Sequence, residues 1–312
     1  MAPGNFGPAL QLDVGVLGVC LGQAWGVRCR GLVSGVDATQ PDEERMLVVD
    51  SHAVVWAQQD ACAILTLNRP DSLNSLTAEV RRELLEGLNR ANQDPLIRVV
   101  AIRAVGRTFC VGQDLKELQH FYAENGYRIG ALVNREYIPI VRALRHLSKP
   151  TVAIVEGAAI GGGMALALAC DFRIVSAKAR LVPAFVNVGL APDTGTTFLL
   201  ARSIGYARAL SLCLLGQPLP ADDLVRMGLA ESVAHGAEEV QAQFDQLLQQ
   251  LVHGPTRAYA EIRRLFDESS HLSFEAVLRQ EAEVQDQLSQ TQDHRVAIEA
   301  FLAKQTPEFS GH

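Results

Sequence analysis

The sequence predicts an α/β fold with a helical C-terminal region. Short apolar runs rich in Val and Ile alternate with stretches of helical periodicity from Met46 to about residue 195. After about residue 195 the strand-like runs stop, and apolar residues recur at spacings of three and four. The chain has 312 residues, of which 48% are hydrophobic and 20% charged, so it is long enough for one large or two small folded domains.

Four runs have the composition of strands buried on both faces, namely residues 63–68, 99–104, 151–156 and 172–176. Helical patterns lie between them. One covers residues 77–91 and has Thr77 at its N-cap, and the other covers 128–147 and has to end before Pro150. This alternation predicts a parallel sheet with right-handed crossovers, and we find no internal repeat in the sequence.

The two ends of the chain differ from this core, which we place at residues 46–254. Residues 255–267, 273–287 and 291–304 have helical spacing and predict a helical region over 255–312. The first 35 residues hold eight of the 25 glycines and show no sustained period, so we expect residues 1–45 to be a mostly disordered extension. An ordered arm is the alternative, as is a true start at Met46, where a strand-like run begins.

Charge and cysteine content argue against several classes of protein. The formal charge of −7 argues against a nucleic-acid binder with a general basic surface. The six cysteines lack C-x-x-C spacing, so we expect no metal site and interpret them as thiols in a reducing compartment. Residues 14–27 are too short and glycine-rich to span a bilayer, and no Lys or Arg precedes them. We therefore expect a cytoplasmic protein without nucleic-acid or membrane partners.

Residues 108–118, TFCVGQDLKEL, form the first segment with chemical meaning. Gly112 allows the backbone to turn, and Asp114 can cap a helix that begins at Leu115. Such a turn exposes backbone amides at a helix start, where they can bind an anion or an oxyanion. An ordinary strand-to-helix loop is the alternative.

Residues 155–171 form the second segment, in which three consecutive glycines precede an Ala/Leu helix. A ligand can approach this backbone closely, and the amide of Gly162 would lie at the positive end of the helix dipole. The segment is neither a P-loop nor a dinucleotide-binding motif, and tight helix–sheet packing is its alternative explanation.

Residues 181–195 form the third segment and end in the turn Pro192-Asp193-Thr194-Gly195, which opens a helix. Taken by itself, Asp193 is most simply an N-cap. Apolar neighbours would raise the pKa of its carboxyl, whereas the helix N-terminus would lower it.

Together the three segments resemble the enoyl-CoA hydratase/isomerase (crotonase) superfamily over about residues 46–309. Residues 68–76 also match the family's N-R-P-x-x-x-N-x-L run, and residues 301–309 match its C-terminal end. The resemblance implies a spiral of ββα units followed by trimerisation helices, and hence a homotrimer or a dimer of trimers. It further implies an acyl-CoA thioester substrate, in which coenzyme A is not a cofactor, and a role in fatty acid metabolism.

The resemblance also assigns roles to individual residues. The amides of Gln113 and Gly162 form an oxyanion hole for the thioester enolate, and one such donor is worth roughly 3–4 kcal/mol. The substrate-binding positions are Arg69, Ser72, Leu73, Cys110, Gly112, Leu115 and Lys116, with Phe301 and Lys304 reaching the CoA of a neighbouring subunit. A solvated helix end is the alternative for Lys304, and a small buried side chain is the alternative for Cys110.

Two departures from the family pattern bear on the reaction. Family hydratases carry glutamates at two positions that are Ala165 and Phe185 here, and neither residue can move a proton. Asp193 instead stands where some isomerases place their only catalytic carboxylate, and residues 189–195 resemble the G-L-x-P-D-x-G of ring-1,2-epoxyphenylacetyl-CoA isomerases.

We therefore expect an isomerase in which Asp193 takes a proton from one carbon and returns it to another. A hydratase or lyase of the same family and a catalytically weak CoA-thioester binding protein are the alternatives. Glu156 is a second candidate carboxylate, with a surface or structural role as its alternative.

Overall fold

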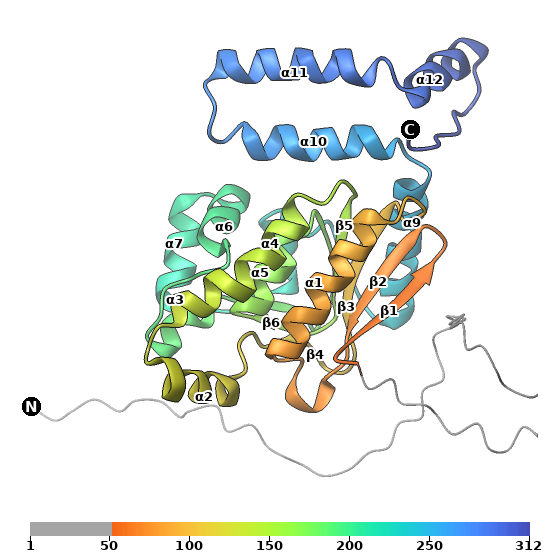
Figure 1. Ribbon diagram of the computed structural model, residues 1–312. Coiled ribbons are helices and arrows are strands. Elements are labelled where there is room, and N and C mark those ends of the chain that lie inside the picture. Colours follow the sequence, from red (N-terminus) through yellow and green to blue (C-terminus); the bar gives the residue numbers. More distant parts are fainter. Residues whose placement is uncertain (1–51) are drawn as a thin grey trace, which may run out of the picture. The chain divides into compact units, whose positions relative to one another are not determined.

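The computed structural model describes residues 52–312, which form two β-sheets, the helices around them and a helical C-terminal region (Figure 1). The strands are β1 (Val54–Gln59), β2 (Cys62–Leu67), β3 (Val99–Ala104), β4 (Thr108–Cys110), β5 (Thr151–Val155), β6 (Ala158–Ile160), β7 (Phe172–Ser176), β8 (Arg180–Val182), β9 (Leu219–Pro220) and β10 (Val233–Ala234). The larger sheet has the order β1-β2-β3-β5-β7-β10 and the smaller one the order β4-β6-β8-β9. Pairing is parallel, as expected, except where β1 meets β2 and β9 meets β8.

The helices alternate with these strands and then continue alone to the C-terminus. They are α1 (Ala78–Gln93), α2 (Leu115–Asn125), α3 (Ile129–Leu132), α4 (Ile138–Arg145), α5 (Gly162–Ala169), α6 (Thr196–Ile204), α7 (Tyr206–Leu215), α8 (Ala221–Arg226), α9 (Ala237–Val252), α10 (Thr256–Glu268), α11 (Phe274–Leu288) and α12 (Gln292–Ala303). A π-helical turn, Val133–Tyr137, joins α3 to α4, and short 3-10 segments cover Pro70–Ser72 and Ala184–Val188.

The chain passes between the two sheets in a repeating order. In β3-β4-α2, β5-β6-α5 and β7-β8-α6, the first strand joins the larger sheet, the second joins the smaller sheet, and a helix follows. This is the expected ββα arrangement. Because β4 and β6 and then β6 and β8 are parallel, the turns that follow them lie at the same edge of the smaller sheet.

The larger sheet is buried on both faces, which explains why its strands read as nearly continuous apolar runs. In β2, Leu65 packs in the cluster that includes Leu84 and Leu88 of α1, whereas its neighbour Ile64 packs in the cluster that includes Phe244 of α9. Successive residues of one strand therefore face two different helices, one on each side of the sheet (Figure 1).

Sequence and structure agree on the main elements and differ at two places. The prediction that strands stop after about residue 195 is wrong, because β9 and β10 follow, each two residues long and too short to leave a pattern. The helix expected over 128–147 is interrupted by the π-helical turn at Val133–Tyr137. The strand-like run that starts at Met46 is described only from residue 52 and forms β1 from Val54. The extension predicted at 1–45 lies outside the described residues.

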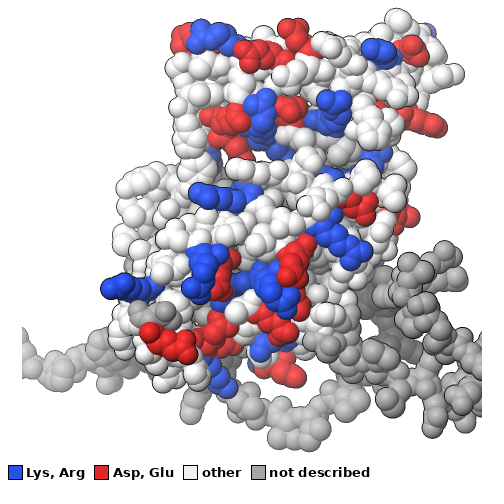
Figure 2. Space-filling model, viewed as in Figure 1, with Lys and Arg blue, Asp and Glu red and all other residues white. Residues whose placement is uncertain are grey.

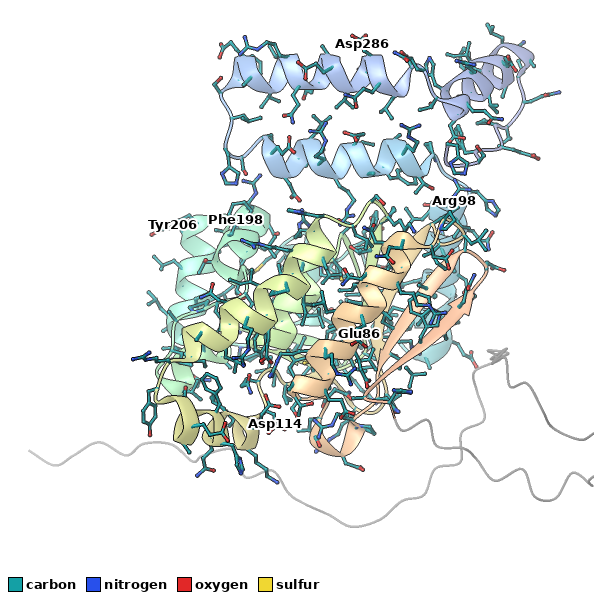
Figure 3. All side chains as sticks on the ribbon, viewed as in Figure 1. Glu86, Arg98, Asp114, Phe198, Tyr206 and Asp286 are labelled. Carbon is teal, nitrogen blue, oxygen red and sulfur yellow. The ribbon has the colours of Figure 1, made fainter. Side chains whose placement is uncertain are left out.

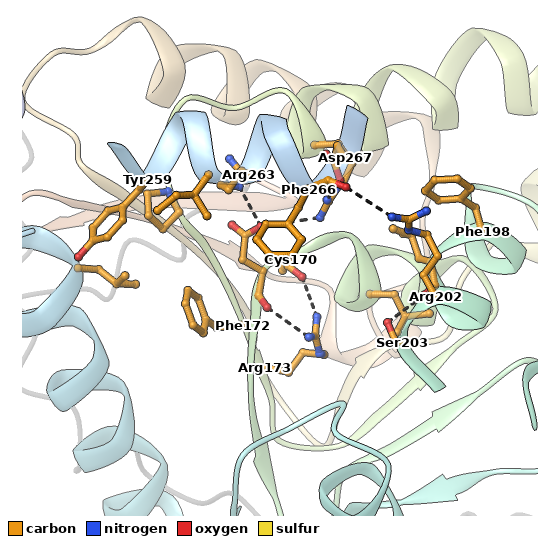
Figure 4. Close-up of a pocket in the computed structure, with 17 residues that line it drawn as sticks. Cys170, Phe172, Arg173, Phe198, Arg202, Ser203, Tyr259, Arg263, Phe266 and Asp267 are labelled. Atoms are coloured by element: carbon orange, nitrogen blue, oxygen red, sulfur yellow. Dashed lines mark hydrogen bonds and ion pairs between the residues drawn. The ribbon is translucent and has the colours of Figure 1, made fainter. Parts of the chain in front are cut away.

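Helix α10 is attached to the core by the side chain of Arg263 (Figure 4). Its Nε lies 2.9 Å from Asp171 Oδ1, and its terminal nitrogens donate to the carbonyls of Leu144 and Lys149, both at 2.8 Å. Arg98 adds a second attachment by donating to Thr256 Oγ1 at 2.9 Å and to the Phe309 carbonyl at 2.9 Å (Figure 3). The boundary predicted at residue 254 falls between α9 and α10.

The charged side chains on the face seen in Figure 2 are of mixed sign. Lys and Arg alternate there with Asp and Glu, so the described residues on this face form no continuous basic surface of the kind that nucleic-acid binders present. Within residues 52–312, we find no helix with the length and apolar character needed to cross a membrane.

Candidate active site

Two glycine turns come into contact at one edge of the smaller sheet. Gly112, after β4, has φ +82, and a Cβ there would lie 2.8 Å from the carbonyl oxygen of Ile160 and 3.0 Å from the nitrogen of Gly162. The backbones of the two turns are therefore so close that a side chain at residue 112 would push them apart. The turn after β4 is also tied to the segment before α1, because the amide of Leu76 donates to the Gly112 carbonyl at 2.7 Å.

This contact brings together the two amides predicted to form an oxyanion hole, those of Gln113 and Gly162. Gly162 is the first residue of α5, so its N–H has no acceptor within the helix and lies at the positive end of the helix dipole. Among the backbone hydrogen bonds of residues 52–312, none is donated by the amide of Gln113 or of Gly162. Both donors are therefore available to a ligand.

A cavity of about 710 Å³ opens in front of these amides. Its volume lies within the range of roughly 300–1,000 Å³ that is usual for small-molecule sites. One part of its wall is apolar and is contributed by Leu118, Ile129, Val133, Tyr137, Ile160, Phe185, Val188 and Leu190.

Most of the predicted site residues line this cavity. They are Arg69, Ser72, Leu73, Gly112, Gln113, Leu115, Lys116, Gly162 and Asp193. Ser72 closes a 3-10 turn, while Leu115 and Lys116 begin α2 directly after Asp114, whose position Figure 3 shows. Four segments that are distant in the sequence therefore contribute to one cavity.

Three of the predicted residues lie elsewhere. Cys110 is not among the residues that line the cavity, so its assignment as a substrate-binding residue stays a prediction. Its side chain is fully buried in β4, burial raises the pKa of its thiol to about 12, and its carbonyl lies only 2.3 Å from where a Cβ on Gly163 would be. Phe301 and Lys304 lie at the end of α12, exposed to solvent and away from the cavity of their own chain.

Asp193 faces the cavity from the turn before α6. Burial raises the pKa of its carboxyl above the usual value, although the hydroxyl of Thr194, which donates to Asp193 Oδ1 at 2.6 Å, opposes this effect. The interpretation of Asp193 as an N-cap is wrong: the N-cap of α6 is Gly195, and only the Asp193 carbonyl, not its carboxylate, accepts a bond from the amide of Thr196. The carboxylate therefore remains free to act on a ligand.

The other carboxylates near the site are differently placed. Burial alone would raise the pKa of Asp114, but bonds from the amides of Glu117 and Lys116 and from the Ser75 hydroxyl hold it below its usual value. Asp71 lines the cavity but is exposed to solvent.

Glu156 is not among the cavity-lining residues, and its Oε2 lies 3.7 Å from a guanidinium nitrogen of Arg103. The pKa of Asp193 is thus raised by burial, whereas the pKa of the nearby Asp114 is lowered by its hydrogen bonds.

The two positions at which the family resemblance leads us to expect glutamates in a hydratase hold apolar residues. Ala165 is fully buried in α5, and Phe185 forms part of the cavity wall. Within residues 52–312, no group of three or more His, Cys, Asp or Glu side chains is arranged to hold a metal ion.

Tyr137 and Arg81 are two residues of the site that the sequence reasoning missed. Tyr137 lines the cavity from the π-helical turn, and its hydroxyl donates to Oε1 of Gln113. Arg81 lies behind the cavity and is only 2% exposed. A signal for Arg81 was present, because it occupies the same face of α1 as the buried Leu84 and Leu88, and a buried arginine requires partners.

Comparison with known proteins agrees with the geometry. The sequence profile of the family described as enoyl-CoA hydratase/isomerase matches residues 57–312. The 1,2-epoxyphenylacetyl-CoA isomerase of Escherichia coli is 36% identical over 247 residues, which are 79% of this chain and 94% of that protein. The trans-2-decenoyl-[acyl-carrier-protein] isomerase of Streptococcus mutans is 34% identical over 267 residues, covering 84% of this chain and 100% of that protein.

A solved structure shows the same fold. The crystal structure of an enoyl-CoA hydratase from Polaromonas sp. JS666 superposes with a TM-score of 0.77 at 32% identity, covering 82% of this chain and 99% of that one. The profile match spans well over half of the chain, and the fold, the two glycine turns and the relatives agree with it. The chain therefore belongs to the enoyl-CoA hydratase/isomerase (crotonase) superfamily.

Proposed function

We propose that the protein is an acyl-CoA isomerase in which Asp193 moves one proton between two carbons of the substrate. The observation that carries this proposal is the position of Asp193, a carboxylate with a raised pKa that faces the same cavity as the amides of Gln113 and Gly162. A base that must also return its proton works best when its pKa lies closer to the working pH than that of an ordinary aspartate.

The reaction follows from these groups. The thioester carbonyl accepts hydrogen bonds from the amides of Gln113 and Gly162, which stabilise the negative charge that builds on its oxygen. The ionised Asp193 removes a proton from the carbon next to the thioester of a 3-enoyl-CoA, giving a dienolate. Asp193 then returns that proton to the far end of the dienolate, which leaves a 2-enoyl-CoA and restores the carboxylate. No water and no cofactor enter this scheme.

The cavity supports an isomerase better than a hydratase. Adding water requires a group that activates it and a group that protonates carbon, and the two family positions for these groups are Ala165 and Phe185. Asp114 is held by its helix cap, so it is not free to replace them. One mobile proton on one carboxylate is enough for isomerisation.

The acyl group would lie against the apolar wall, and the CoA would extend past Arg69 and Lys116 at the polar side of the cavity. A ring-epoxide thioester, as named for the Escherichia coli relative, and a linear enoyl thioester are both compatible with this wall.

We further propose that the chain works as a homotrimer or a dimer of trimers. The C-terminal helices carry large apolar side chains in solvent, with Phe274 71%, Phe301 80% and Leu302 76% exposed. Large apolar side chains exposed on these helices are the kind of surface that a protein–protein contact would cover. In such an assembly, Phe301 and Lys304 would reach the CoA of a neighbouring subunit.

Incubation of the protein with 3-enoyl-CoA and with 2-enoyl-CoA in heavy water tests the reaction. An isomerase moves the double bond and adds no mass beyond exchanged deuterium, whereas a hydratase adds the mass of water. A protein that only binds thioesters does neither, although acyl-CoA would raise its melting temperature. Mass gained from water with either substrate would contradict the proposal.

A further inference from the structure

Behind the cavity, the guanidinium of Arg81 connects three elements to the turn that carries Gln113. Arg81 comes from α1 and is 2% exposed. One of its terminal nitrogens lies 2.6 Å from Glu117 of α2 and 2.5 Å from Glu136 of the π-helical turn. Two carboxylates therefore balance the buried charge and fix the plane of the guanidinium.

The other terminal nitrogen of Arg81 points at the turn itself. It donates to the carbonyl of Leu76 at 2.5 Å and to Oε1 of Gln113 at 3.4 Å. The hydroxyl of Tyr137 donates to the same Oε1, and its ring lies under the guanidinium, whose carbon is 5.0 Å from the ring centroid. The Gln113 side chain is thus held at its oxygen by two donors, and its Nε2 donates to the Asp114 carbonyl at 2.9 Å.

Leu76 and Gln113 are the two members of an isolated parallel β-bridge. Arg81 contacts the backbone carbonyl of Leu76 and the side chain of Gln113. Arg81 does not line the cavity, so it does not touch a ligand there. Any effect of Arg81 on the reaction therefore passes through the residues that it contacts, which are the two members of the bridge and Tyr137.

We propose that Arg81 is a positioning residue, which aims the amide of Gln113 at the thioester oxygen by fixing both members of the Leu76–Gln113 bridge. The inference rests on the proposed function, in which that amide polarises the thioester. An oxyanion donor is effective only when it is held in place before the reaction, and a donor on a loose turn loses that advantage. Arginine suits this role because its planar guanidinium donates hydrogen bonds to several acceptors at once, whereas the lysine ammonium is a point charge on a flexible side chain.

The test uses two variants. Arg81→Lys keeps the positive charge but removes the planar guanidinium. Gln113→Ala keeps the backbone amide but removes the side chain that Arg81 and Tyr137 contact. Arg82→Lys is the matched control, since Arg82 is the next residue of α1, is exposed, and pairs with Glu83 and Glu86, neither of which lines the cavity. The probe is cinnamoyl-CoA with a carbon-13 label at the thioester carbonyl, and the readout is the infrared C=O stretch with and without protein.

In the wild-type protein, we expect the C=O stretch to move to lower frequency on binding, because two amides polarise the carbonyl. Arg81→Lys and Gln113→Ala should each lose about half or more of that shift, since one of the two donors is no longer aimed. Their isomerisation kcat should fall about tenfold or more while KM changes little, because the loss affects the transition state. The double variant should lose no more of the C=O shift and of kcat than the more strongly affected single variant, because both substitutions remove the contact between Arg81 and Gln113.

The outcomes separate this inference from the proposed function. If the wild-type protein shows no shift, the oxyanion hole itself is wrong. If the wild-type protein shows the shift and both variants retain it in full, the role of Arg81 is overturned while the oxyanion hole stands. If Arg81→Lys does not fold, Gln113→Ala decides alone, and a full shift in that variant overturns the inference.

Discussion

Asp193 lies in surroundings that act on its charge in opposite directions. Burial raises the pKa of the carboxyl, and the Thr194 hydroxyl, at 2.6 Å from Oδ1, stabilises the ionised form. The carboxylate must be ionised to accept a proton, so activity should rise with pH through the raised pKa of Asp193. We therefore expect the acidic limb of the pH–kcat profile above the ordinary aspartate value of about 3.9.

Changing Thr194 should move that limb in a known direction. Thr194→Val removes the hydrogen bond that favours ionisation, so the pKa of Asp193 should rise further and the limb should shift to higher pH. Thr194→Ser keeps the hydroxyl and should leave the limb in place. The measurement is kcat against pH for the three proteins. Identical limbs in the valine and wild-type proteins would show that another group controls the profile.

At the residue scale, the sequence could predict which groups belong to the cavity but not their electrostatics. The glycine turns and Asp193 were recognisable from their order and spacing. The direction of the Asp193 pKa was not, because it depends on whether the carboxylate caps α6, and the cap is Gly195 instead. Cys110 precedes the cavity-lining Gly112 by only two residues but is buried in β4, a difference that sequence spacing cannot resolve.

At the scale of elements, Arg263 gives the docking of α10 a precise test. Its guanidinium donates to Asp171 and to three core carbonyls, those of Leu144, Leu147 and Lys149, and its side chain is only 10% exposed. Arg263→Ala should lower the free energy of unfolding by about 3 kcal/mol, because it leaves buried acceptors without their donor. Arg264→Ala, on the same helix, removes only ion pairs with Glu261 and Glu268 and should cost at most about 1 kcal/mol.

Denaturant unfolding of these two variants beside the wild-type protein measures both values. Equal losses for Arg263→Ala and Arg264→Ala would mean that the contacts of Arg263 do not hold α10 to the core.

The elements that could be predicted are those whose burial dictates their composition. The strands of the larger sheet are covered by helices on both faces, so their sequences are nearly all apolar, and α1 carries a clear apolar stripe. The two-residue strands β9 and β10 form through backbone pairing with β8 and β7, which leaves no pattern of side chains. The π-helical turn before α4 is a single turn of i→i+5 hydrogen bonding between two α-helical segments, too short to stand out in the periodicity of the sequence.

At the scale of the whole molecule, the passage of the chain between two sheets could not be read from periodicity. The strands β4, β6 and β8 have three residues each, and their pairing depends on parallel neighbours far along the chain. The ββα arrangement was expected only because the motifs resemble a family that has it.

The proposed assembly has a test at the same scale. If Lys304 reaches the CoA of a neighbouring subunit, Lys304→Glu should raise the Kd for an acyl-CoA about tenfold, because a carboxylate would face a phosphate. Arg295→Glu, an exposed charge reversal on the same helix, should leave the Kd unchanged. Titration calorimetry gives the Kd, and sedimentation equilibrium gives the mass of the assembly. A monomeric mass, or equal effects of the two variants, would contradict the contact.

The central claim is that Asp193 is the sole proton carrier, and the rate at which Asp193→Asn converts 3-enoyl-CoA to 2-enoyl-CoA tests it most directly. Asparagine keeps the size of the side chain and removes the base. We predict a loss of about a thousandfold in kcat. The melting temperature at neutral pH should not fall, because a buried carboxylate with a raised pKa costs stability once it is ionised. A variant that folds, binds acyl-CoA and isomerises it within about tenfold of the wild-type rate would contradict the claim.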